Sequence, residues 1–274
     1  TWLFSTVVRS HLEENSLPWK NAGISGWILD PDRKKMSKSK GNAVTPIDLL
    51  KEYGSDAVRY WASMGRPGTD TAFDIGQMKI GKRLAVKILN ASKFALSLDA
   101  TLNKSDVKLD LDHSLLNKLS EVIDQATSAF HKYDYTKALE VTETFFWSFT
   151  DNYVELVKER TYGKQGEESA KSAKAVLGLT IHALLRLFSP FVPFVCEEVW
   201  SWWQKGSVHL QKWPTTSEVV SNPSISAVHL ETITNILAEV RKSKTEKQLS
   251  MKAEVELLKI AASDEILQQI KSSE

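Results

Sequence analysis

The 274-residue sequence predicts a mainly helical protein in which a helical bundle follows a shorter mixed segment. From about residue 74 onward, apolar side chains recur every three or four residues over four long stretches, which is the period of an amphipathic helix. Four such helices can share one core as a bundle. Before residue 74 the periodic stretches are short and are interrupted by glycine, proline and polar turns, so smaller elements are expected there.

The first 46 residues predict three short elements. Residues 1–14 form an amphipathic pattern, and Pro18 is expected to end that helix. The apolar run 24–29 is typical of a strand, and the Asp-Pro-Asp sequence at 30–32 is typical of a turn. Residues 33–46 are polar and basic, so a loop is expected there.

Two short helices are expected next. Thr45 suits the N-cap of the first helix, and Pro46 suits its first turn because the missing N–H has no intrahelical partner at that position. Gly54 is expected to end this helix, and Asp56 to start the second one. Residues 65–69 contain two glycines and a proline and predict a loop.

The bundle helices are expected around apolar stripes at 80–95, 115–130, 139–156 and 176–188. Pro190 is expected to break the last of them before a further helical stretch. Near the C-terminus, residues 228–242 predict a helix and residues 249–260 predict either a strand or a helix. The polar end, 262–274, is expected to fray.

Composition excludes several classes of protein. The chain is 42% hydrophobic and 25% charged, which excludes a wholly disordered protein, and no apolar run is long enough for a membrane span. One cysteine, Cys196, excludes a disulfide framework, suits a reducing compartment and is expected to be buried. His182, in an apolar helix, is expected to be a packed histidine rather than a ligand, and no spacing typical of a metal site occurs.

Net charge does not indicate a partner, because 35 basic and 34 acidic residues nearly cancel, so local clusters must be examined. In segment 33–42, five of the first eight residues are basic and none is acidic. Lysine ammonium groups, the hydroxyls of Ser37 and Ser39, and a flexible Gly41 suit the phosphates of a nucleotide. The alternative is a solvated basic loop or a localisation signal.

The order of residues within this loop favours the first interpretation. Lys35-Met36-Ser37-Lys38-Ser39 is identical to the KMSKS signature of the class I aminoacyl-tRNA synthetases. The flanking residues 26–30 and 53–61 also resemble the strand before that loop and the helices after it. Agreement over some thirty flanking residues makes the resemblance much more specific than five residues alone.

Within this class the chain resembles the valyl-tRNA synthetase family over almost its whole length. The segments that carry the resemblance are 64–74, 87–94, 146–158, 187–194, 197–200, 213–214, 241–244 and 250–255. The isoleucyl- and leucyl-tRNA synthetase families share much of this outline and remain alternatives. A tRNA-binding module without catalytic activity is a third alternative, although such a module would have no need of an intact KMSKS loop.

The resemblance implies three regions. Residues 1–74 would be the end of a Rossmann-type α/β catalytic domain, with the KMSKS loop and a stem-contact region. Residues 75–215 would be a helical-bundle anticodon-binding domain, and residues 216–274 a C-terminal extension with one helix and a small α/β element. The parent enzyme would activate valine with ATP and transfer it to tRNA(Val). Because Thr1 lies at the start of an apolar helical stretch, the chain is expected to be part of that longer enzyme.

The resemblance also assigns roles within the loop. Lys35 and Lys38 would be the catalytic residues, holding the triphosphate as pyrophosphate leaves, and Met36, Ser37 and Ser39 would complete the ATP-binding loop. Mg²⁺ would accompany ATP, and no carboxylate indicates a dedicated metal site. The family's other signature, HIGH, and its amino-acid pocket have no counterpart in this sequence, so the chain alone is expected to be inactive.

Binding of tRNA is expected on the bundle, where basic side chains contact phosphates and an aromatic ring stacks on an unpaired base. A solvated helical face, and for Phe94 a place in the core, are the alternatives. We expect a monomer in the cytoplasm that does not bind membranes. The candidate tRNA-binding residues are Lys79, Lys82, Arg83, Lys87, Phe94, Arg241, Lys242 and Lys244.

Overall fold

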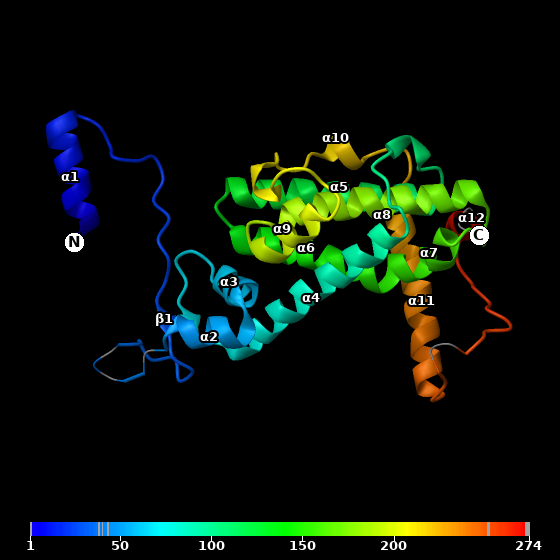
Figure 1. The fold of residues 1–274 in the computed structure, drawn as a ribbon, viewed down its shortest axis with the longest axis horizontal. Coiled ribbons are helices and arrows are strands. Elements are labelled where there is room, and N and C mark those ends of the chain that lie inside the picture. The colour runs from blue at the N-terminus through cyan, green and yellow to red at the C-terminus, as the bar shows by residue number, and fades with distance from the viewer. Residues whose placement is uncertain (1, 38, 40, 43, 251–252, 272–274) are drawn as a thin grey trace. The chain divides into compact units, whose positions relative to one another are not determined.

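The computed structural model describes residues 2–37, 39, 41–42, 44–250 and 253–271 (Figure 1). Contacts between Cα atoms divide the chain into two units, which are described one at a time. The first unit consists of Thr1–Val44 and Gly65–Phe73, and the second consists of Thr45–Met64 and Asp74–Glu274.

Among its described residues, the first unit contains the helix α1 (Trp2–Glu14) and two very short parallel strands, β1 (Ile28–Leu29) and β2 (Thr71–Ala72). The predicted helix over 1–14 is confirmed, but the strand predicted over 24–29 is only two residues long. Gly26 lies so close to the following loop that an added Cβ would be 2.1 Å from the carbonyl oxygen of Thr69. This close approach of two backbones requires a glycine at that position.

The second unit begins with α2 (Pro46–Tyr53) and α3 (Ser55–Ser63). Thr45 is the N-cap residue of α2, as predicted, although its side chain makes no capping hydrogen bond. Gly54 has φ +89, which favours glycine, so α2 ends there and α3 starts one residue before the predicted position. The Asp56 carboxylate accepts hydrogen bonds from the backbone N–H groups of Phe194 and Val195, at 3.0 and 2.8 Å.

The predicted bundle is confirmed, with one difference in its third helix. The stripe at 139–156 is interrupted by a π-helical turn, Phe149–Tyr153, which divides it into two helices. The last long helix is apolar around most of its circumference and runs through the middle of the bundle, in contact with helices on several sides (Figure 1). The bundle helices are α4 (Ile75–Ser97), α5 (Asp110–His131), α6 (Tyr135–Ser148), α7 (Val154–Thr161), α8 (Glu167–Phe188) and α9 (Pro193–Ser201).

Aromatic rings fill the centre of the bundle. Phe146, Phe149, Tyr153 and Phe188 are almost completely buried, and the rings of Phe146 and Phe188 meet edge to face with centroids 5.5 Å apart. Cys196 is buried too, as predicted, and burial raises the pKa of its thiol well above the usual value.

One ionic network is buried inside this apolar core. The carboxylate of Asp112 on α5 has no exposed surface and pairs with the Arg160 guanidinium on α7, with N···O distances of 2.6 and 3.0 Å. It also accepts hydrogen bonds from the hydroxyls of Tyr153, at 2.6 Å, and Ser172, at 2.5 Å. The network therefore joins α5, the π-helical turn, α7 and α8.

The C-terminal part contains α10 (Thr216–Val219), α11 (Val228–Glu246) and α12 (Asp264–Lys271). The helix predicted over 228–242 is confirmed. The end that we expected to fray contains α12, and the described residues 253–261 form neither the strand nor the helix that we considered. Ser114 and Asn117 on α5 hold the start of α11 and the turn before it through bonds to backbone groups.

His182 is packed in an aromatic cluster, as its apolar helix predicted. Its ring stacks on Trp200 with centroids 4.9 Å apart, and a guanidinium N–H of Arg186 lies 3.1 Å from its Nδ1. Arg186 also pairs with Glu218 at 2.7 Å. Burial, with a smaller effect from the Arg186 charge, lowers the pKa of His182 to about 4.

This shift predicts a loss of stability in mild acid. Because the folded pKa lies below the ordinary 6.5, the unfolded chain binds the proton more readily, so stability falls as the pH drops through 6.5 towards 4. A His182→Phe variant keeps a ring against Trp200 and has no such proton. We expect the wild-type chain to lose about 2 kcal/mol more than the variant between neutral pH and pH 4, measured by urea unfolding. Equal losses would contradict the assignment to His182, since His113 and His229 titrate in both proteins.

No helix in the described part of the chain combines the length and the apolar character that are needed to cross a membrane.

Candidate functional site

The backbone of the basic loop in the first unit is held by a pair of side chains at its base. The Asp30 carboxylate is buried and accepts hydrogen bonds from the backbone N–H of Lys34, at 2.7 Å, and from the side-chain amide of Asn42, at 2.8 Å. The amide oxygen of Asn42 accepts a bond from the N–H of Ser37 at 3.0 Å. These bonds, that of Lys34 first, lower the pKa of Asp30, so its carboxylate is charged at neutral pH. We call Asp30 and Asn42 the loop clamp.

The signature residues that the sequence indicated, Lys35–Ser39, lie between the two residues of this clamp. The ammonium of Lys35 lies 3.5 Å from the centroid of the Trp27 ring, and the Lys35 side chain is exposed. Met36 and Ser37 are half-buried, and the hydroxyls of Ser37 and Ser39 are 3.2 Å apart. The predicted catalytic residue Lys38 lies outside the described residues, so its role stays a prediction. Sequence reasoning named neither Trp27 nor the clamp as functional.

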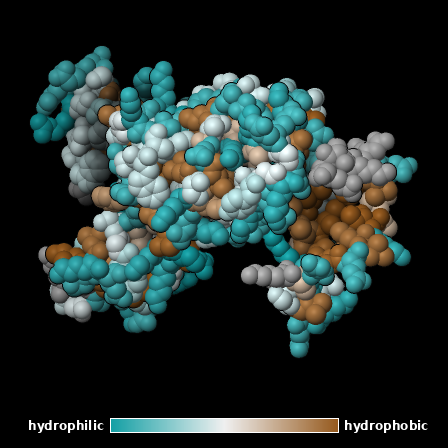
Figure 2. All heavy atoms as spheres, turned by 45° about the vertical axis from the view of Figure 1, so that its right-hand side comes forward, coloured by the Kyte–Doolittle hydropathy of each residue, from teal (hydrophilic) through white to brown (hydrophobic). Residues whose placement is uncertain are grey.

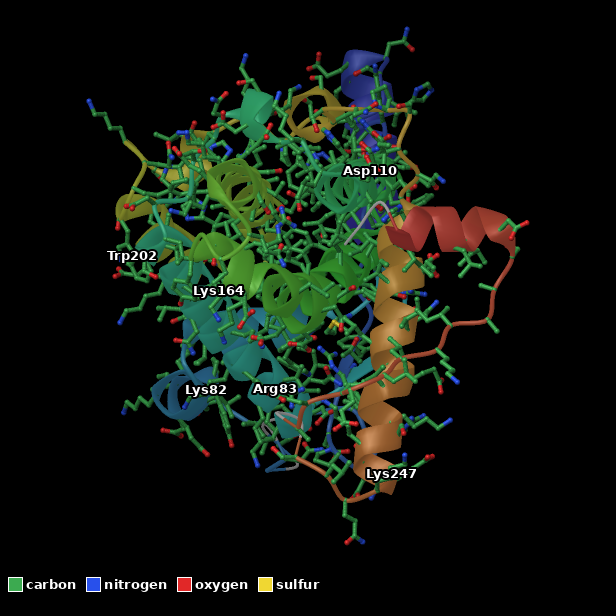
Figure 3. All side chains as sticks on the ribbon, turned by 90° about the vertical axis from the view of Figure 1, so that its right-hand side faces the viewer. Lys82, Arg83, Asp110, Lys164, Trp202 and Lys247 are labelled. Atoms are coloured by element: carbon green, nitrogen blue, oxygen red, sulfur yellow. The ribbon has the colours of Figure 1, made fainter. Side chains whose placement is uncertain are left out.

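A second candidate site follows the outer face of α4 in the second unit. Lys79, Lys82 and Arg83 are exposed there, and Figure 3 labels two of them. The Lys82 ammonium donates to the carbonyl oxygen of Glu52 at 3.2 Å, and the Arg83 guanidinium lies 5.7 Å from the ring centroid of Trp147. We call these three residues the α4 basic patch. The structure therefore brings together the three basic residues that sequence placed on one helix.

Two other predicted residues meet at the π-helical turn. Lys87 pairs with the carboxylate of Asp151 at 2.9 Å. Arg241 donates to the side-chain oxygen of Asn152 at 2.8 Å and to the carbonyl oxygen of Asp151 at 3.0 Å. Sequence analysis missed Asp151 and Asn152, because a π-helical turn leaves no mark in the apolar period.

The remaining candidates differ in their environments. Phe94 is half-buried and packs against the bundle core, which agrees with the alternative placement, and a stacking role for it stays a prediction. Lys242 pairs with Glu239 at 4.0 Å, and Lys244 donates to the carbonyl oxygen of Ala253 at 2.6 Å. The second basic cluster on α11 is therefore partly engaged in contacts within its own region.

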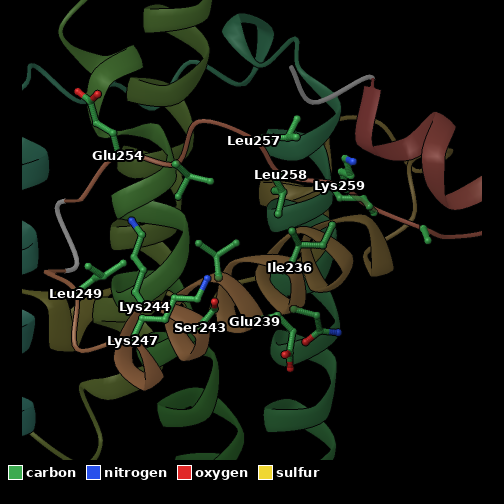
Figure 4. Close-up of a pocket in the computed structure, with 15 residues that line it drawn as sticks. Ile236, Glu239, Ser243, Lys244, Lys247, Leu249, Glu254, Leu257, Leu258 and Lys259 are labelled. Atoms are coloured by element: carbon green, nitrogen blue, oxygen red, sulfur yellow. The ribbon is translucent and has the colours of Figure 1, made fainter.

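A pocket of about 620 Å³ lies between α11, Leu249 and the residues 254–261 (Figure 4). Its apolar lining includes Ile236, Leu257 and Leu258, and Leu257 is 70% exposed. Figure 2 shows a patch of apolar surface on the right of the molecule. Within the described ranges, no group of three or more His, Cys, Asp or Glu side chains is arranged to hold a metal ion. The lining of the pocket thus combines apolar side chains with charged ones, among them Glu239, Lys244 and Lys259.

Comparisons with known proteins match two family models to different parts of the chain. The family model for the anticodon-binding domain of tRNA ligase matches residues 112–260, and the model for class I tRNA synthetases (I, L, M and V) matches residues 1–74. The valine–tRNA ligase of Thermobifida fusca is 59% identical over 93% of this chain and 29% of its own length. That of Cutibacterium acnes is 48% identical over 100% of this chain and 32% of its own length. The chain thus spans about a third of these curated relatives.

A solved structure supports the fold independently. The ternary complex of Agrobacterium radiobacter K84 agnB2 LeuRS with tRNA and LeuAMS matches with a TM-score of 0.65 and covers 89% of this chain and 33% of that one. At 19% sequence identity this likeness establishes the architecture alone.

Proposed function

The chain belongs to the class I tRNA synthetases and carries their anticodon-binding domain, and from this premise we propose that it works as part of a valine–tRNA ligase. That enzyme would activate valine with ATP and transfer it to tRNA(Val). The observation that carries the proposal is the intact Lys35–Ser39 signature on a clamped loop, in a chain 46–59% identical to valine–tRNA ligases. We further propose that the protein is a cytoplasmic monomer. Its three regions would be residues 1–74, 75–215 and 216–274.

The loop would act on the phosphates of ATP. Attack of the valine carboxylate on the α-phosphorus forms the aminoacyl adenylate, and the bond to the bridging oxygen breaks so that pyrophosphate leaves with its electron pair. Negative charge grows on the leaving phosphates, and the ammonium groups of Lys35 and Lys38 would stabilise it. Met36, Ser37 and Ser39 would shape the loop around the triphosphate. Mg²⁺ would arrive with ATP and neutralise part of the same charge.

The bundle would bind the anticodon arm of the tRNA. The α4 basic patch supplies three exposed cations on one helix face, which suits a run of backbone phosphates. Lys87 and Arg241 lie beside it at the π-helical turn, where acceptor atoms of Asp151 and Asn152 hold both side chains. Phe94, Lys242 and Lys244 remain candidates for contacts to bases or to further phosphates.

The proposal is tested by binding of the chain to tRNA(Val), tRNA(Ile) and tRNA(Leu) over a salt series from about 50 to 200 mM. We expect tRNA(Val) to bind at least about tenfold more tightly than the other two, because readout of unpaired anticodon bases adds to the shared phosphate contacts. A tRNA(Val) transcript with an isoleucine anticodon is the control and should lose the preference. Equal and steeply salt-dependent binding of all three would contradict the valine assignment.

A further inference from the structure

The first unit holds a rigid platform beside the signature loop. The backbone of Trp27 is fixed on both sides, because its N–H donates to the carboxylate of Asp70 at 2.7 Å and its carbonyl oxygen accepts from the N–H of Thr71 at 2.9 Å. The side chain of Trp27 is nevertheless 60% exposed. A large apolar ring that is anchored through its backbone yet left open to solvent is available for a ligand or for a neighbouring side chain.

The neighbouring side chain is that of Lys35. Its ammonium lies 3.5 Å from the centroid of the indole, a distance at which the negative face of the ring attracts a cation. Three carboxylates of this unit have other partners: Asp32 pairs with Lys34 at 3.7 Å, Asp30 belongs to the loop clamp, and Asp70 accepts from the N–H of Trp27. In the described part of the chain, the Lys35 ammonium thus rests against the indole of Trp27.

The loop clamp fixes the backbone from which the Lys35 side chain extends. Asn42 joins Asp30 to the backbone N–H of Ser37, and Lys35 itself makes a backbone bridge with Leu29. The backbone on both sides of Lys35 is thus fixed relative to the strand that carries Trp27. Moving the ammonium away from the ring requires rotation of the flexible lysine side chain and no rearrangement of the loop base.

We propose that Trp27 is a positioning residue for Lys35. The indole holds the Lys35 ammonium beside the loop until the phosphates of a triphosphate replace the ring as its partner. The exchange is favourable because a phosphate oxygen offers the ammonium a charge-assisted hydrogen bond, whereas the ring offers only a quadrupole. The inference rests on the proposed function, since it assigns the phosphates of a nucleotide as the group that displaces the ring.

The contact is tested by fluorine NMR of the chain labelled with 5-fluorotryptophan. A Trp27→Phe variant assigns the Trp27 resonance among the nine tryptophans by its disappearance. We expect Lys35→Met, which removes the charge and keeps the length of the side chain, to shift that resonance. The matched control is Lys34→Met, since Lys34 lies next to Lys35 but pairs with Asp32. An unchanged Trp27 resonance in the Lys35→Met protein would overturn the inference.

The exchange is tested with inorganic tripolyphosphate as the probe. Titration into the wild-type chain should move the Trp27 resonance towards its position in Lys35→Met. In Trp27→Leu, tripolyphosphate should bind about threefold more tightly by calorimetry, because no ring competes for the ammonium. Unchanged affinity in that variant, with normal binding by the wild type, overturns the inference and leaves the proposed function intact. No binding by the wild-type chain overturns the exchange and also counts against the proposed role of the loop.

Discussion

An Asp112→Ala variant is expected to lose about 3–5 kcal/mol of its free energy of unfolding, because the Arg160 guanidinium would remain buried without its counter-charge. The Arg160 side chain is only 7% exposed, so water cannot replace the carboxylate. The hydroxyls of Tyr153 and Ser172 would lose their acceptor as well. Urea unfolding followed by circular dichroism measures the effect, and a chain too unstable to fold at room temperature is within the expected range.

Two further variants test whether the loss of stability comes from the uncompensated buried charge or from any substitution in a bundle helix. Replacing both partners, as Asp112→Leu with Arg160→Met, is expected to recover a large part of the lost stability, since no uncompensated charge remains in the core. The control is Glu140→Ala, which removes a half-exposed partner of Lys137 on α6 and should cost no more than about 0.5 kcal/mol. A loss below about 1 kcal/mol in Asp112→Ala would contradict the role of the network.

Neutralising the α4 basic patch, as Lys79→Gln, Lys82→Gln and Arg83→Gln together, is expected to weaken binding of tRNA about 100-fold near 150 mM salt. Each phosphate contact releases about 0.9 counterions, which is worth about fivefold in affinity at that salt concentration. The slope of log affinity against log salt should therefore fall by about 2–3. Filter binding or fluorescence anisotropy over a salt series measures both quantities.

The matched control removes three exposed lysines that are paired on their own helices. Lys118, Lys137 and Lys171 contact Glu121, Glu140 and Glu167 respectively, so each already has a compensating charge. The triple glutamine variant of these lysines should change the affinity for tRNA by less than about threefold. Equal effects of the two triple variants would show that net charge, and not the face of α4, governs binding.

Much of the bundle could be predicted because its signal is local. The apolar stripes at 80–95, 115–130 and 176–188 correspond to α4, α5 and α8, since a three-to-four-residue period specifies both a helix and its buried face. The stop at Gly54 was predictable for the same reason, because a positive φ is tolerated by glycine at little cost. The length of the strand predicted over 24–29 could not be predicted in this way. A strand forms only where a partner pairs with it, and the partner of β1 lies beyond residue 68.

The sequence by itself determined which stretches are helical, which faces are apolar, and that a KMSKS loop precedes the bundle, since these properties reside in the order of neighbouring residues. Only the tertiary structure decided the partners of the charged and polar side chains. Asp112 meets Arg160 across 48 residues, and Trp27 meets Asp70 across 43. Such pairs depend on the path of the whole chain through space, which apolar periodicity does not encode, so the core ion pair and the resting place of Lys35 became visible only in three dimensions.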